Sequence, residues 1–141
     1  MRRALPAACF ASVLAACLAS LAGCGFGVRS PDLFLLTRTG QGRAVTLLVN
    51  DGGTIRCDGG RARRLADPLL LRARDLAAGL DGDAKRKLRL PAPPNSAFHY
   101  SVKLQDGTIA FPDTAAASHP ELGQVELFAV QAAQQACGLP G

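Results

Sequence analysis

Four consecutive residues near the amino terminus have the types and the order of a processing site. They are Leu21, Ala22, Gly23 and Cys24, an apolar residue and two small residues followed by a thiol. Small side chains let a chain enter a peptidase cleft in an extended conformation, and a cysteine thiol can act as a nucleophile. The pattern therefore favours cleavage before Cys24 and chemistry at its sulfur.

The residues before these four are typical of an export signal. Met1 to Arg3 are positively charged, and Ala4 to Ser20 are uncharged and largely apolar. The whole segment resembles the signal peptide and lipobox of bacterial lipoproteins. The resemblance implies removal of residues 1–23, attachment of diacylglycerol with acyl chains such as palmitate to Cys24, and a lipid-anchored location on the extracytoplasmic side of the cell membrane. Each buried CH₂ contributes about 0.8 kcal/mol, so two or three acyl chains give a stable anchor.

Two other interpretations of this segment stay open. It could be an ordinary cleaved signal peptide with a chance cysteine after an A-x-A-like site. It could also be an uncleaved anchor, because no residue from Ala4 to Val28 is charged and that length spans a bilayer. The glycines at 23, 25 and 27 argue against the anchor.

The remaining cysteines form an even set. Cys9 and Cys17 leave with the signal and Cys24 takes the lipid, so Cys57 and Cys137 are left in an oxidising compartment. A disulfide between them would close a long loop in the unfolded chain. By the chain-entropy estimate this stabilises the folded state by about 4–5 kcal/mol. The alternative is two separate buried thiols.

Length and composition limit the class of protein. The chain has 141 residues, a net charge of +5, no tryptophan and one tyrosine. We expect a signal peptide over 1–23, a lipidated cysteine with a short tether over 24–31, and one globular domain over 32–141. The mild charge and the lack of aromatic residues argue against nucleic acid as a partner.

Periodicity and turn residues predict an α+β domain with the order strand-strand-strand-helix-strand-strand-helix. The expected strands are Leu33–Thr37, Ala44–Val49, Thr54–Cys57, Phe98–Leu104 and Thr108–Phe111. We expect a helix over 67–80 with Asp67 as its N-cap, and a second helix opened by a capping box at residues 118–121. The fold is then one antiparallel sheet of four to five strands with two helices packed on one face.

Residues that could perform catalysis are few. His99 is expected on the outward face of a strand and His119 in a helix cap, and neither belongs to a catalytic motif. No metal-ligand spacing and no phosphate-binding glycine pattern occurs, so we expect no metal, no cofactor and no enzyme. The basic residues Lys85, Arg86, Lys87 and Arg89 are expected in a solvated loop, where they could add weak attraction to an anionic membrane.

From Leu33 to Cys137 the layout resembles the emfourin-type inhibitors of thermolysin-like metalloproteases. The similar features are the opening hairpin, the Leu-rich helix at 67–80, Phe98-x-Tyr100-x-Val102, Asp106-Gly107, Phe111-x-Asp113, and a last helix with Pro120 and Leu122. The resemblance implies protease inhibition but assigns no inhibitory residue. The lipobox and the pair Cys57 and Cys137 depart from that family's pattern.

The sequence thus predicts a lipid-anchored, non-enzymatic binding or accessory domain of the cell envelope. Its partners would be the membrane, through the diacylglycerol, and an envelope protein or a protease. The alternatives are a membrane-displayed protease inhibitor and an envelope hydrolase that uses His99 with a distant carboxylate.

Overall fold

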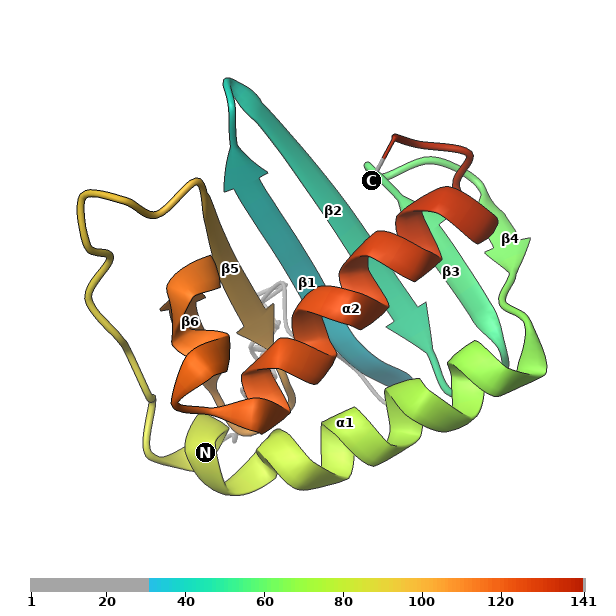
Figure 1. The fold of residues 1–141 in the computed structure, drawn as a ribbon. Coiled ribbons are helices and arrows are strands. Elements are labelled where there is room, and N and C mark those ends of the chain that lie inside the picture. Colours follow the sequence, from blue (N-terminus) through green and yellow to red (C-terminus); the bar gives the residue numbers. More distant parts are fainter. Residues whose placement is uncertain (1–30, 141) are drawn as a thin grey trace, which may run out of the picture.

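The computed structural model describes residues 31–140, and Cys24 with the expected signal segment lies outside the described residues. One antiparallel sheet has the strand order β4-β3-β2-β1-β5-β6, and both helices lie on the same side of it (Figure 1). The elements are β1 (Asp32–Gly40), β2 (Arg43–Asn50), β3 (Thr54–Cys57), β4 (Ala62–Arg64), α1 (Asp67–Lys85), β5 (Phe98–Lys103), β6 (Thr108–Pro112), the 3₁₀ helix η1 (Asp113–Ala117) and α2 (Pro120–Gln135). The predicted α+β class is confirmed, with six strands instead of four to five.

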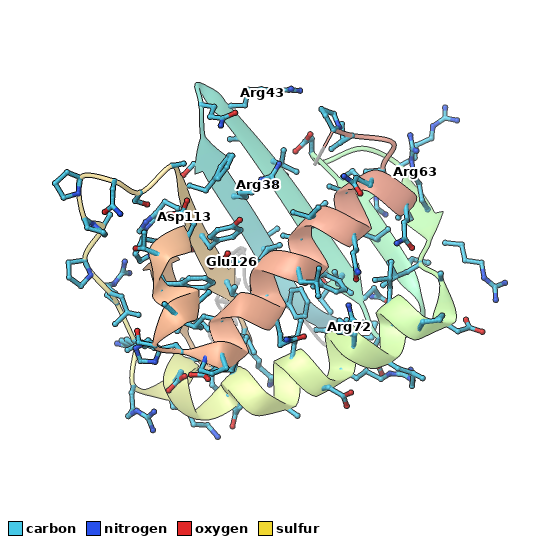
Figure 2. The ribbon with its side chains drawn as sticks, in the orientation of Figure 1. Arg38, Arg43, Arg63, Arg72, Asp113 and Glu126 are labelled. Carbon is cyan, nitrogen blue, oxygen red and sulfur yellow. A yellow bond between two sulfur atoms is a disulfide. The ribbon has the colours of Figure 1, made fainter. Side chains whose placement is uncertain are left out.

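The central strands alternate between a face buried under the helices and a half-exposed face, as period-2 patterning requires. The most deeply buried side chains of β1, β2 and β5 are Phe34, Leu36, Leu47, Val49, Tyr100 and Val102. Arg38 follows on the same side of β1, two residues beyond Leu36 (Figure 2). The opposite face of the sheet carries hydroxyl side chains, and Thr37 lies between Thr46 and Ser101 in the strand register.

Helix α1 begins one residue earlier and ends later than the sequence suggests. Ala66 is the N-cap residue, and Asp67, which we expected to cap the helix, is its first residue. The helix passes Gly79, which faces open space, and continues until Ala84 is fully buried. The stripe that packs on the sheet is Leu69, Ala73, Leu76, Leu80 and Ala84. Burial of Ala84 thus outweighs the helix-weakening effect of glycine.

Helix α2 lacks the capping box that the sequence predicts. No side-chain hydrogen bond caps its first turn, and Ser118 Oγ donates to the Ala115 carbonyl of η1 at 3.4 Å instead. Ser118 is the C-cap residue of η1, so its hydroxyl bonds to that turn and is not available to cap α2. The helix is held by packing: Phe128 meets Phe34 of β1 edge-to-face, with ring centroids 5.6 Å apart.

Both edges of the sheet offer little free backbone for pairing with further strands. At one edge, β4 is three exposed residues long and pairs with β3, with Arg63 opposite Ile55. At the other, the backbone of Leu88 and Leu90 exchanges hydrogen bonds with Ala110 of β6. Short, charged or covered edges are how sheet proteins avoid pairing with other chains.

Candidate functional site

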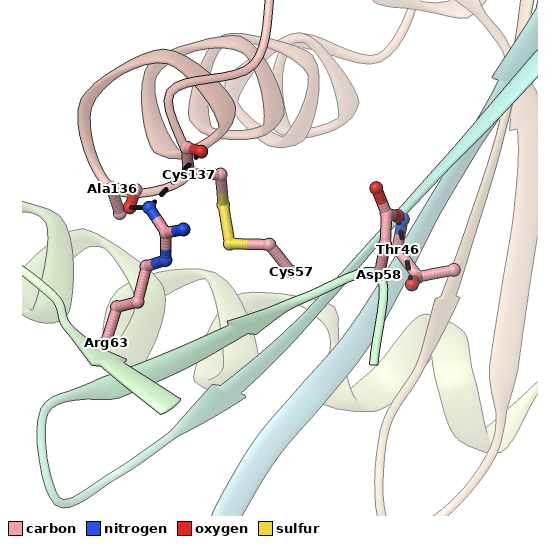
Figure 3. Close-up of a disulfide and its surroundings, with 6 residues drawn as sticks. All are labelled: Thr46, Cys57, Asp58, Arg63, Ala136 and Cys137. Atoms are coloured by element: carbon pink, nitrogen blue, oxygen red, sulfur yellow. Dashed lines mark hydrogen bonds between the residues drawn. A yellow bond between two sulfur atoms is a disulfide. The ribbon is translucent and has the colours of Figure 1, made fainter. Parts of the chain in front are cut away.

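The two cysteines expected to pair lie together where β3 meets the carboxyl end of α2. The sulfur atoms of Cys57 and Cys137 are at disulfide distance, 1.90 Å, with their Cα atoms 5.9 Å apart (Figure 3). Beside them, the Arg63 guanidinium donates to the carbonyls of Ala136 at 3.3 Å and Cys137 at 3.4 Å. This corner therefore ties the last helix to the β4 edge of the sheet by two kinds of contact.

The structure places neither histidine beside another side chain that we considered for catalysis. His99 lies on the open face of β5 opposite Thr39, whereas the partly buried carboxylates described below lie on the helix side. His119 occupies the N-cap position of α2, with Nδ1 3.6 Å from Glu121 Oε1. Within residues 31–140 no group of three or more histidine, cysteine or acidic side chains is placed to hold a metal ion.

The expected basic cluster lies at the end of α1, and its first two members are paired with acids. Lys85 Nζ lies 2.6 Å from Asp81 Oδ2 and 3.6 Å from Asp106 Oδ2, and Arg86 pairs with Asp83. The hydrogen bond from Lys85 to Asp81 raises the pKa of this lysine. These charges are locally neutralised, so this end of the helix is a poor anion site.

A charged group that the sequence did not predict lies on the helix side of β1 and β5 (Figure 2). The Arg38 guanidinium sits 5.0 Å from the centre of the Phe98 ring. Next to it, Tyr100 is buried and stacks on Phe111 with ring centroids 5.3 Å apart. Burial raises the pKa of Tyr100, Glu126 raises it further, and the positive charge of Arg38 opposes them.

Two carboxylates close this group from α2 and η1, and their environments differ. Asp113 accepts hydrogen bonds from Ser96 Oγ at 2.8 Å and from the backbone of Ala97 and Phe98 at 3.1 Å. Burial would raise the pKa of Asp113, but these hydrogen bonds outweigh it and the pKa is lowered. Glu126 Oε1 is shielded from solvent with no hydrogen-bond partner, and burial together with the Asp113 charge raises the pKa of Glu126 to about 7. Asp113 is therefore charged at neutral pH, whereas Glu126 holds its proton far more readily.

A cavity of about 180 Å³ opens beside Arg38, between the β1–β2 hairpin and the residues after α2. Its main lining residues are Arg38, Arg43, Val45, Phe98, Leu139 and Pro140. Gly40 brings the hairpin against the loop before β5, because a Cβ there would lie 2.4 Å from the Ala97 carbonyl oxygen. The hairpin turns tightly at Gln41 and Gly42, which have φ values of 51° and 71°.

Polar residues inside apolar patterns are the signal that could have revealed this site. Arg38 continues the face of β1 that carries Phe34 and Leu36, and Glu126 lies between the buried Val125 and Phe128 of α2. A charged residue at a core-facing position usually has a partner or a function. The pattern does not say which residues of distant strands and helices meet it.

Comparison with protein-family models, with curated proteins and with solved structures gave no significant match to this chain. Among the described residues, no helix is both long and apolar enough to cross a membrane.

Proposed function

We propose that this protein is an exported lipoprotein whose domain acts as a non-enzymatic binding or accessory module of the cell envelope. The observation that carries the proposal is the run Leu21-Ala22-Gly23-Cys24, placed after an uncharged apolar segment and shortly before a folded domain. In this assignment, diacylglycerol on Cys24 holds the chain on the extracytoplasmic face of the membrane.

The position of the first strand supports this arrangement. β1 begins at Asp32, eight residues after Cys24, so a fully extended tether reaches at most about 28 Å. The domain would then sit close to the lipid surface. Its β1–β2 hairpin and the cavity beside Arg38 lie at the far end of β1, about 26 Å along the strand.

The cysteine pair is a second support. Stable disulfides form in oxidising compartments outside the cytoplasm. Cys57 and Cys137 lie at disulfide distance, and of the chain's five cysteines the other three fall at or before residue 24.

Intact mass spectrometry of the protein from its host's membrane fraction tests the proposal. We expect a chain that starts at Cys24, carries diacylglycerol and is two hydrogens lighter than the reduced form. A Cys24→Ser variant should stay as an unprocessed precursor without lipid. A soluble chain that starts elsewhere, or a native chain that keeps residues 1–23, would contradict the proposal.

Protease inhibition is the second candidate, and it rests on the resemblance of the sequence to emfourin-type inhibitors. The segments that carry this resemblance include the Leu-rich helix α1, the strand β5 with the spacing Phe98-x-Tyr100-x-Val102, and the final helix α2. The test is inhibition of thermolysin-like proteases, including those exported by the host, at micromolar concentrations of the purified protein. Unchanged proteolysis would remove this candidate.

A further inference from the structure

We propose that the cavity beside Arg38 is a binding site for an organic carboxylate with a small apolar body. This inference does not depend on the lipid anchor. It rests on two arginines, the half-buried Arg38 and the exposed Arg43, that line one partly open cavity of about 180 Å³ together with apolar side chains.

The sheet register sets the spacing of the two arginines. Arg38 pairs with Val45 across β1 and β2, and Arg43 is two residues from Val45 on the same face. Diagonal neighbours of this kind have Cα atoms about 7–8 Å apart, so the long side chains can reach one ligand group. Figure 2 shows both arginines on the helix side, with Arg43 toward the hairpin end.

The charge of the site is uncompensated by the residues that line it. None of the lining residues is acidic, and neither arginine forms an ion pair with any residue in the described range 31–140. Arg38 is held in place by its contact with Phe98. Arginine is the side chain best suited to bind a carboxylate through two parallel hydrogen bonds.

The rest of the lining selects the body of the ligand. Val45, Phe98, Leu139 and Pro140 supply apolar surface next to the guanidinium groups. A cavity of about 150 Å³ is enough to hold a benzene molecule, so this cavity accepts a group of that size or slightly larger. A branched or aromatic side chain next to a carboxylate fits both parts, and either a free acid or the carboxyl terminus of a peptide offers that chemistry.

Isothermal titration calorimetry of the full chain in nonionic detergent, with N-acetyl-leucine as the probe, tests the inference. We expect binding that weakens about tenfold or more for N-acetyl-leucinamide, which keeps the body and lacks the charge. An Arg43→Gln variant should lose about tenfold or more in affinity, and Arg61→Gln, which changes an exposed arginine outside the cavity, should bind as the native chain does. Melting temperatures of both variants check that they fold.

A second set of probes identifies the source of the carboxylate. N-acetyl-Ala-Ala-Ala-Leu that binds about tenfold more tightly than N-acetyl-leucine supports a peptide terminus, and equal affinity supports a small free acid. Acid and amide binding equally, no binding of either, equal affinity for inorganic phosphate, or affinity unchanged by Arg43→Gln would each overturn the inference.

Discussion

Glu126 lies in the environment least suited to its charge. Its Oε1 atom is enclosed between α2 and the sheet without a hydrogen-bond donor, and Asp113 adds a second negative charge nearby. A carboxylate in such a place is stabilised by taking up a proton. The folded state therefore binds this proton at pH values at which the unfolded chain has released it.

This difference predicts a pH-dependent stability. The pKa of Glu126 is about 7 in the folded chain, against an ordinary value of 4.5 for a glutamate, so stability should fall as pH rises from about 4.5 to 7 and stay lower above. Glu126→Gln removes the charge and should raise the melting temperature at pH 8 by about 3–6 °C, or about 1 kcal/mol after a discount for solvent screening. At pH 4 the variant should melt as the native chain does.

The control is Asp75→Asn, which changes an exposed acidic residue of the neighbouring helix α1. Scanning calorimetry between pH 4 and 8 gives the comparison. If the native chain and Glu126→Gln show the same slope with pH, the pKa of Glu126 is the same in the folded and the unfolded chain, and its environment is more polar than described.

Sequence patterns located the residues of this region but not their contacts. The alternation of β5 correctly placed Tyr100 and Val102 inward and His99 outward. Arg38 and Glu126 are 88 positions apart along the chain, and only the docking of α2 on the sheet brings both to Tyr100. Contacts between residues so far apart in the chain leave no local signal in the sequence.

Among the elements, the hairpin between β5 and β6 shows how a glycine can serve packing. The sequence suggests Asp106-Gly107 as the centre of a tight turn, yet Leu104 and Gly107 are hydrogen-bonded opposite each other and the turn centres on residues 105 and 106. A Cβ on Gly107 would lie 2.0 Å from the Ala84 carbonyl oxygen. The missing side chain lets the end of α1 touch the hairpin backbone.

Two glycine-to-alanine substitutions should therefore have opposite effects. Gly107→Ala should destabilise the domain by about 1–3 kcal/mol, because the backbone of α1 must move away. Gly79→Ala, which lies within α1 and faces open space, should stabilise it by about 0.5–1 kcal/mol. Urea unfolding midpoints measure both. A neutral Gly107→Ala would mean that the contact with Ala84 is looser than the structure has it.

The elements that the sequence predicted are those with strong local signals. Pro68 in the first turn and the Leu-rich stripe are local signals for α1, and the run Asn50-Asp51-Gly52-Gly53 is a local signal for the turn between β2 and β3. β4 was missed because its three residues are all exposed and show no alternation. It is a strand because the turn at Asp58, whose Oδ1 accepts the Thr46 N–H at 2.7 Å, leads the chain back along β3 (Figure 3).

At the scale of the whole molecule, the contact between Cys57 and Cys137 joins strand β3 to the residues at the end of helix α2. The pair links residues 80 positions apart, from the β4 side of the sheet to the end of the last helix. A bridge over that separation restricts the unfolded chain strongly, by about 4–5 kcal/mol in the chain-entropy estimate.

Cys57→Ser and Cys137→Ser should therefore lower the melting temperature by similar amounts. Reductant should lower the melting temperature of the native chain to the same value and leave the melting temperatures of both variants unchanged. Calorimetry with and without reductant makes the comparison, and intact mass reports the two missing hydrogens. No effect of reductant on the native chain, or clearly unequal effects of the two substitutions, would count against the bridge.

The short or covered edges of the sheet limit how neighbouring copies of the domain can associate. Strand-by-strand growth needs a free backbone row, and here one row is three residues long and arginine-rich while the other is occupied by the segment around Leu88 and Leu90. Copies held on one membrane by the proposed lipid anchor could then pack densely without forming a continuous intermolecular sheet. Neighbouring copies would then meet through side chains and not through a shared ladder of backbone hydrogen bonds.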